Sequence, residues 1–304
     1  VIELQQMGAT VSTQGLERLL GAPIGTTQFL TKEGGHLDRL ADKAVRTVEA
    51  YAKLHTPQAQ YGMLLYSAAH TLTHLPRLVR PAVLAGYTIR LQAALQNGVQ
   101  TLLTLQNFTD HQRAVCVLPI REGGLGLVSA HEVLLPAFVT SHGATIRQLK
   151  KTGWDESSEI AQVLVGKAAL RDAVDEVNYF IKASELKVRC KLLDVERPDL
   201  WPTQHTLSAA FHKVNADEVE DSLAATNPSF AGWFASMRLP GAGSWLRANP
   251  SLYVYKVSPE LYRVQLSMRV MAPIRALTGP DKKCKCGYRR RALLHKRMFE
   301  RAGA

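Results

Sequence analysis

The stretch HLDRLADKAVRTVEAYA, residues 36–52, carries an apolar side chain at about every third or fourth position. One turn of an α-helix takes 3.6 residues, so this spacing gathers the apolar side chains on one helix face. The apolar positions are Leu37, Leu40, Ala41, Ala44, Val45, Val48, Tyr51 and Ala52. The stretch therefore predicts an amphipathic helix that packs its apolar face against other helices.

The next stretch, residues 57–75, shows the same period. Pro57 suits the first turn of a helix, and the apolar positions of that helix run from Tyr61 to Leu75. His70 and His74 are four residues apart, so a continuous helix would place them on a common face. They could hold one edge of a metal site, but no third ligand is evident.

Further helices are expected downstream. Residues 82–106 have a helical pattern, with a break predicted at Asn97–Gly98. Ser129 precedes Glu132 by three residues, the spacing of a capping box that begins a helix. The remaining helical patterns lie within residues 155–195, 206–225 and 258–270.

Composition supports this interpretation. The chain has 304 residues, 46% of them hydrophobic and only 7% aromatic, which suits a large core built mainly from Leu and Ala. No apolar run reaches the length of a membrane span, so no membrane partner is expected. The first residue is Val rather than Met, so the chain is expected to be a fragment. We predict a mainly α fold: a helical bundle, a second helical region and a basic, flexible C-terminal tail.

Positive charge is concentrated in two places. The formal net charge is +11, and the segment from Lys282 to Arg301 holds nine Lys or Arg against one acid. No Asp or Glu lies between Glu49 and Asp110, a stretch that contains Arg77, Arg80 and Arg90 among its cations. Clustered cations attract polyanions, so nucleic acid is the first candidate partner, bound as RNA or DNA through its phosphates. A solubilising tail and a solvated helix face are the equally weighted alternative.

The candidate phosphate-binding side chains follow from these clusters. They are Arg77, Arg80 and Arg90 of the helical region and Lys282, Lys283, Lys285, Arg289, Arg290 and Arg291 of the tail.

The cysteines suggest one metal site and no disulfide framework. Four cysteines are scattered along the chain, which fits a reducing intracellular location, with the nucleus as one option for a nucleic-acid binder. Cys284, Cys286 and His295 could supply three zinc ligands, but a structural zinc site needs four. Zinc is therefore the one candidate cofactor, at an incomplete site.

No other motif indicates catalysis. The segment REGGLGL, residues 121–127, matches neither a phosphate loop nor a dinucleotide fingerprint and is expected to form a tight corner. Cys116 is expected to be a buried, small apolar residue. No pair of carboxylates has the pattern of acid–base or two-metal chemistry.

Several segments, in order, resemble the post-palm part of non-LTR retrotransposon reverse transcriptases. GLERLLGAPIG (15–25) resembles the exit from the palm, and LLYSAAHTLTHLPRLVRP (64–81) resembles the thumb helix. VLPIREGGLGLVSA (117–130), followed by Ala137, Phe138 and Ser141, resembles the Gly-Gly-Leu-Gly-Leu stretch of the family. GSWLRANP (243–250) is similar to its Trp-Leu…Pro motif, and CKCG with His295 is similar to the start of its zinc knuckle.

The resemblance implies an order of parts. Residues 1–30 would end a palm-like segment, 31–115 a helical thumb-like region, and 116–200 a second helical region. Residues 201–280 would form a linker with a small helical region, and 281–304 a basic tail with an incomplete zinc knuckle.

Departures from the family pattern limit the expected function. The Tyr-x-Asp-Asp motif, which supplies metal-binding carboxylates for nucleotidyl transfer, does not occur in this sequence. We therefore expect a nucleic-acid-binding remnant, and no enzyme as the chain stands. The alternatives are a helical scaffold for protein–protein interaction and, with less support, a metal-dependent enzyme that uses His70, His74 or the cysteine pair.

Overall fold

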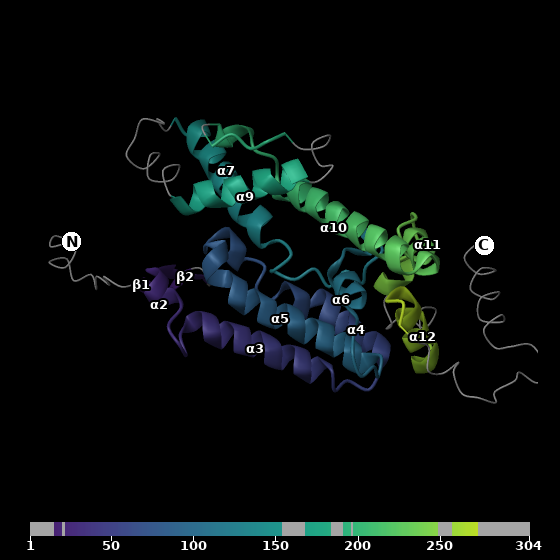
Figure 1. The fold of residues 1–304 in the computed structure, drawn as a ribbon. Helices are drawn as coiled ribbons and strands as arrows, with labels where there is room; N and C mark the ends of the chain where they lie inside the picture. The colour runs from purple at the N-terminus through teal and green to yellow at the C-terminus, as the bar shows by residue number, and fades with distance from the viewer. Residues whose placement is uncertain are drawn as a thin grey trace, which may run out of the picture.

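The computed structural model describes residues 15–19, 22–153, 168–183, 191–195, 197–248 and 257–272. These residues form a mainly helical fold, which confirms the predicted fold class (Figure 1). A short antiparallel hairpin precedes the helices, made of β1 (Gly15–Leu19) and β2 (Ala22–Gly25), with Leu16 opposite Ile24. The helix α2 (Thr27–Leu30) follows, and the Thr26 side chain accepts a hydrogen bond from the Phe29 amide at its start.

The first helices pack around the face predicted from residues 36–52. Helix α3 (His36–Tyr51) buries Leu37, Ala41, Ala44 and Val48 and lies along α5 (Pro81–Leu102). The expected break in α5 does not occur. Gly98 stays helical because its missing side chain lets Val48 and Leu64 approach the helix.

The segment after Pro57 is less regular than predicted. Helix α4 (Pro57–Tyr66) ends early, and two 3₁₀ turns, η1 (Ala68–His70) and η2 (Leu75–Arg77), complete the connection to α5. His70 and His74 are therefore not one turn apart on an α-helix, and both are exposed.

The capping box lies at a different helix from the predicted one. Thr109 and Gln112 form it at the start of α6 (Asp110–Val117). Helix α7 (Leu134–Lys151) begins later than predicted and has no side-chain cap, because Val133 at its N-cap has no polar side chain. The Ser129 hydroxyl donates to Gln92. Pro136 is the third residue of α7, where its missing N–H costs no helix bond.

The rest of the described chain adds four helices and two 3₁₀ turns. These are α9 (Ala168–Ala183), η5 (Pro198–Leu200), α10 (Gln204–Thr226), α11 (Pro228–Met237), η6 (Ser244–Arg247) and α12 (Pro259–Arg269). The predicted helices near 206–225 and 258–270 are thus present.

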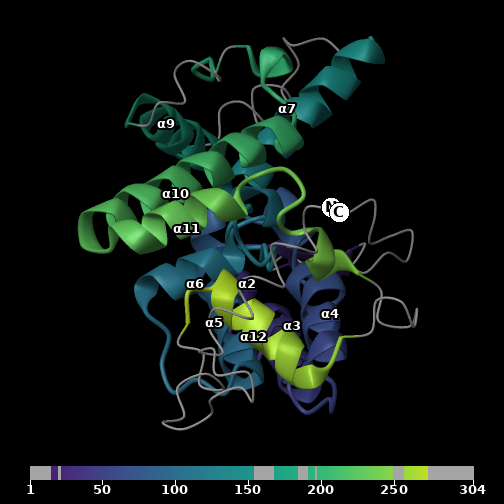
Figure 2. The ribbon, with the colours of Figure 1, turned by 90° about the vertical axis from the view of Figure 1, so that its right-hand side faces the viewer.

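Buried apolar residues form two clusters. The larger one draws on α3 to α6, the loop to residue 134, the second half of α10, and α11 and α12. The smaller one draws on α7, α9, residues 193–201 and the first half of α10. Figures 1 and 2 both show α9 and α10 on one side of the molecule and α3, α4 and α12 on the other. Helix α10 therefore joins the two clusters.

A buried arginine organises the glycine-rich corner. Arg269 of α12 is 3% exposed and donates to the carbonyl oxygens of Ile120 (2.7 Å), Gly124 (3.0 Å) and Ala242 (3.4 Å). A methyl group on Gly243 would lie 2.2 Å from the Ile120 side chain. Residues 117–130 and Gly243, which belong to two segments of the family resemblance, therefore meet around one side chain. The corner predicted for REGGLGL is present, with positive φ at Gly123 and Gly126.

Candidate nucleic-acid interface

The structure places the three helical arginines in two different surroundings. Arg77 ends η2 and Arg80 precedes the first residue of α5, and both are exposed. The Nε of Arg77 donates to Gln204 Oε1 at 3.0 Å, which links η2 to the first residue of α10. Arg90 instead points toward α3.

Arg90 is already paired with carboxylates. Its Nη1 lies 3.2 Å from an oxygen of Asp38, and its Nη2 contacts Asp42. A phosphate at Arg90 would have to displace two acids of α3. The sequence named Arg77, Arg80 and Arg90 alike as candidate phosphate contacts, and the structure shows that Arg90 is engaged with α3, whereas Arg77 and Arg80 are exposed.

A small hollow lies beside Arg77. It has a volume of about 110 Å³ and is lined by Arg77, Ser141, His142, Thr145 and Ile146. Helix α7 supplies four of these residues and packs directly against η2. We call this hollow the Arg77 pocket.

Local bonds hold the polar residues of the pocket in place. The Ser141 hydroxyl lies 2.9 Å from the Arg77 carbonyl and 2.8 Å from the Phe138 carbonyl. His142 Nδ1 lies 2.8 Å from the Phe138 carbonyl, and its ring packs on Phe138 with the centroids 4.6 Å apart. The pocket thus presents a guanidinium, two hydroxyls and an imidazole above the buried Ile146 side chain.

Three segments around the pocket contain no acidic residue. Residues 68–81, the whole of α7 and residues 204–216 have neither Asp nor Glu, and they carry Arg77, Arg80, Arg147, Lys150, Lys151 and Lys213. Asp199 of the adjoining η5 is paired with Lys150 at 3.3 Å and with Arg197 at 3.6 Å. We call residues 68–81, 134–151 and 204–216 together the acid-free surface.

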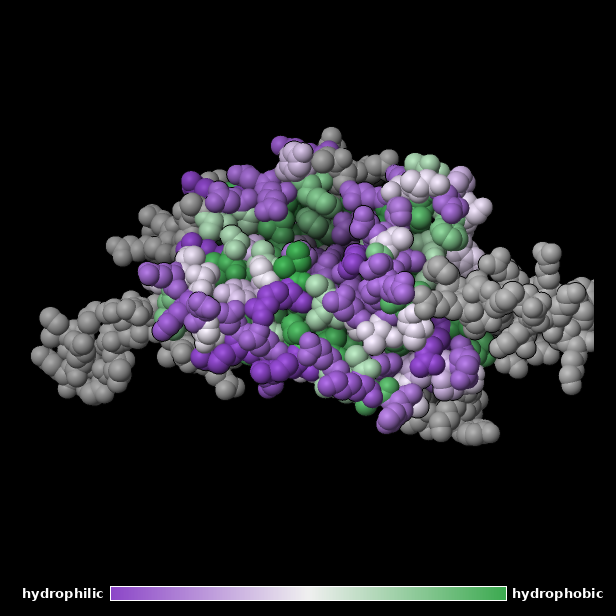
Figure 3. Space-filling model, turned by 60° about the horizontal axis from the view of Figure 1, so that its bottom comes forward, coloured by the Kyte–Doolittle hydropathy of each residue, from purple (hydrophilic) through white to green (hydrophobic). Residues whose placement is uncertain are grey.

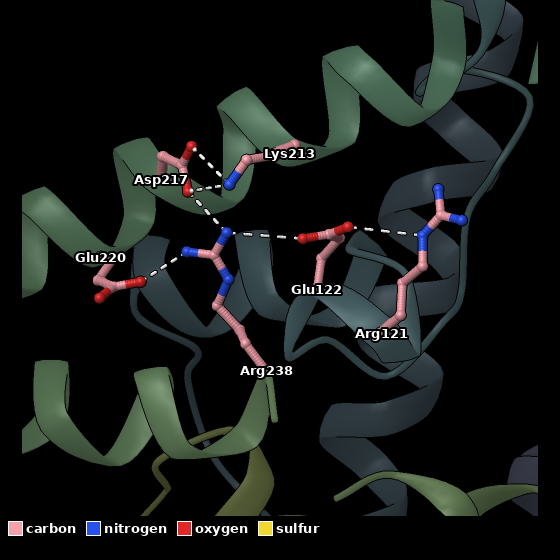
Figure 4. Close-up of polar contacts among 6 residues, drawn as sticks. All are labelled: Arg121, Glu122, Lys213, Asp217, Glu220 and Arg238. Atoms are coloured by element: carbon pink, nitrogen blue, oxygen red, sulfur yellow. Dashed lines mark hydrogen bonds and ion pairs between the residues drawn. The ribbon is translucent and has the colours of Figure 1, made fainter. Parts of the chain in front are cut away.

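A second group of cations is neutralised within the protein. Arg238 of α11 contacts Asp217 and Glu220 of α10, each at 2.6 Å, and Glu122 at 3.6 Å (Figure 4). Arg121 and Lys213 pair with members of the same group. These ion pairs tie α10 to α11 and to the glycine-rich corner, so this cluster has a structural role.

The tail candidates lie outside the described residues. This applies to Lys282, Lys283, Lys285, Arg289, Arg290 and Arg291, and to the zinc candidates Cys284, Cys286 and His295. Within the part of the chain that is described, no three His, Cys, Asp or Glu residues gather as a metal site would require. Zinc binding stays a prediction. Cys116 is buried as expected, and burial raises the pKa of its thiol well above the ordinary value.

The pocket residues of α7 gave little signal in the sequence. Ser141 appeared only in the family resemblance, while His142 and Thr145 were not singled out. Their contact with Arg77 bridges 64 residues of chain. The sequence shows that residues 134–151 contain no Asp or Glu, but no sequence pattern indicates that this helix contacts η2.

Comparison of the chain with family models, with curated proteins and with solved structures finds no match. No helix among the described residues is long and apolar enough to cross a membrane.

Proposed function

We propose that this chain binds nucleic acid through phosphate contacts, as the post-palm remnant of a reverse transcriptase of the non-LTR retrotransposon type. The ordered motif resemblance and the net charge of +11 support the proposal. The observation that carries it is the acid-free surface, where three segments distant in sequence meet around the exposed Arg77. The proposal covers binding alone, since the sequence lacks Tyr-x-Asp-Asp.

Phosphate contacts determine what kind of binding to expect. Arg77, Arg80 and the exposed Lys151 of α7 would meet backbone phosphates, with the Lys and Arg residues of 282–291 adding further contacts. Such contacts contribute affinity and position without reading base sequence. The expected ligand is therefore a single or double strand of RNA or DNA, bound with little sequence preference.

The scaffold alternative needs an apolar docking area, and the exposed apolar residues do not favour one. The large exposed hydrophobic side chains are distributed over many elements, from Leu54 after α3 to Leu239 after α11. On the face drawn in Figure 3, hydrophobic residues of the described part show as small patches between hydrophilic ones. Specific interfaces usually have a more contiguous apolar centre.

Arg77→Gln tests the proposal, with Arg46→Gln as the matched control. Arg46 is an exposed residue of α3, so the control removes the same charge away from the acid-free surface. Arg77→Gln should weaken binding by roughly three- to tenfold on every sequence tried, and Arg46→Gln by less than about twofold. Fluorescence anisotropy with labelled RNA and DNA measures this, and circular dichroism checks the fold. Equal losses in the two variants, or no binding by the unmodified chain, would overturn the proposal.

A further inference from the structure

The size of the Arg77 pocket restricts what can enter it. Its volume of about 110 Å³ is well below that of pockets that enclose whole small molecules, roughly 300–1,000 Å³. A hollow of this size matches a small group such as one tetrahedral oxyanion better than a whole nucleobase or ribose.

The lining has the chemistry of an oxyanion site. Arg77 offers a planar fork of donors, of which Nε is held by Gln204, so the guanidinium plane is fixed against α10. The Thr145 hydroxyl donates to the Ser141 carbonyl of α7, which also accepts a helical N–H bond, so turning this hydroxyl toward a ligand leaves that carbonyl bonded. The Ser141 hydroxyl lies within hydrogen-bond distance of the Phe138 carbonyl and of the Arg77 carbonyl, so a ligand would compete with these two acceptors for its proton. Buried Ile146 is the apolar member of the lining.

The charge around the pocket favours a doubly charged group. No acid lies on the acid-free surface, and its exposed cations include Arg80 and Lys151. Lys150 of the same surface pairs with Asp199, and Arg147 donates to the carbonyls of Asp199 and Trp201. The N-terminus of α10, a helix of 23 residues, lies next to Arg77, because Gln204 accepts a hydrogen bond from that side chain. The positive end of the α10 helix dipole adds to the positive potential at the pocket. A phosphate monoester carries about −1.5 to −2 charges near neutral pH, more than a backbone diester does. A monoester also offers three unesterified oxygens to the Arg77 guanidinium and the hydroxyls, whereas a diester offers two.

We infer that the Arg77 pocket binds a terminal phosphate monoester, so that the protein holds the phosphorylated end of an oligonucleotide. The inference rests on the proposed function and narrows it from phosphate contacts in general to recognition of a strand end. An internal phosphate is a diester with two free oxygens and one negative charge, so it gains less from Arg77 and the hydroxyls than a terminal monoester does. Internal phosphates bind the cations outside the pocket.

The test compares otherwise identical single strands of about 15 nucleotides, long enough to contact the cations outside the pocket. One strand carries a 5′-phosphate, one a 3′-phosphate and one only hydroxyl ends. The full chain should bind one phosphorylated strand about five- to tenfold more tightly than the hydroxyl strand, measured by fluorescence anisotropy. The two phosphorylated strands identify which end is preferred. Inorganic phosphate should reduce this preference when added as a competitor.

Variants tie the preference to the pocket. Thr145→Val keeps the side-chain shape and removes a hydroxyl, and Arg77→Lys keeps the charge and removes the fork; both should lower the preference at least about threefold. Arg46→Gln should keep it. Equal binding of all three strands by the unmodified chain would overturn end recognition and leave phosphate binding intact. If the unmodified chain bound none of the three strands, the proposed function itself would be overturned. A preference that survives both pocket variants would place the end site elsewhere and also overturn the inference.

Discussion

His212 is a buried histidine of α10 whose Nδ1 finds no hydrogen-bond partner among the described residues. Burial, reinforced by the nearby charge of Arg121, lowers the pKa of His212 to about 4. The imidazole is therefore neutral in the folded protein at pH 7. A buried polar atom without a partner is tolerated more easily on a neutral ring than on a charged one.

This burial makes the stability of the fold depend on pH. The unfolded chain protonates His212 near its ordinary pKa of about 6.5, whereas the folded chain does so only near 4. Between these values the unfolded state binds more protons, so the free energy of unfolding falls as the pH drops from about 6.5 to 4. The contribution of His212 to this fall should be at most about 3 kcal/mol.

Urea unfolding of the unmodified chain and of His212→Gln, at several pH values from 7 to 4, measures the effect. The variant should show the smaller loss on acidification, because its side chain does not titrate. Burial also lowers the pKa of His131, which is present in both proteins, so the difference between the two curves belongs to His212. Parallel curves would show that His212 takes up its proton equally well in the folded state.

Single residues also show why the candidate site was only partly predictable. Arg77 was found because a long stretch without acids drew attention to its cations. Arg90 was predicted by the same pattern, yet its partners Asp38 and Asp42 lie about fifty residues earlier, where no local pattern links them to it. Ser141, His142 and Thr145 joined the site through tertiary contact alone.

Among the helices, the contact of α7 with η5 depends on a glycine. A methyl group on Gly143 would lie 2.8 Å from the Pro198 carbonyl and 3.1 Å from the Trp201 ring. Gly86 of α5 is exposed, and the space beside it is open. Gly143 is thus closely packed against a neighbouring segment, whereas Gly86 faces open space.

Alanine at each position should change stability in opposite directions. Gly143→Ala should lower the free energy of unfolding by about 1–3 kcal/mol, because α7 must move away from η5. Gly86→Ala should raise it by roughly 0.5–1 kcal/mol, because alanine restricts the unfolded chain and favours the helix. Thermal unfolding of both variants measures the difference. Equal shifts would mean that α7 and η5 separate freely in solution.

The helices themselves were largely predictable, because their signal is local. The period of residues 36–52 predicted α3, and the patterns near 206–225 and 258–270 predicted α10 and α12. The errors came where tertiary packing replaced a local signal. Gly98 was predicted to break the helix, whereas it lies inside α5, and a methyl group there would be 3.2 Å from Val48 and 3.4 Å from Leu64. Ser129 matched a capping box, but its hydroxyl bonds to Gln92 across the fold.

For the whole molecule, two apolar clusters share α10, and the acid-free surface lies where α7 and the start of α10 meet η2. Some charged groups elsewhere pair internally, as around Arg238 and Arg90. The cations that the proposal assigns to a polyanion are those of the acid-free surface and those of residues 282–301. Their relative contributions can be separated by the dependence of binding on salt.

Each phosphate neutralised by a cation releases counterions, so the logarithm of the binding constant falls linearly with the logarithm of salt concentration. Contact with about six phosphates of duplex DNA implies a slope near −5. Replacing Lys282, Lys283 and Lys285 by Gln in the full chain should make the slope shallower by about three, and Arg77→Gln by about one. Filter binding between low and moderate salt measures both. A flat line for the unmodified chain would exclude phosphate binding, whereas a steep line that no lysine variant changes would assign the affinity to the helical body alone.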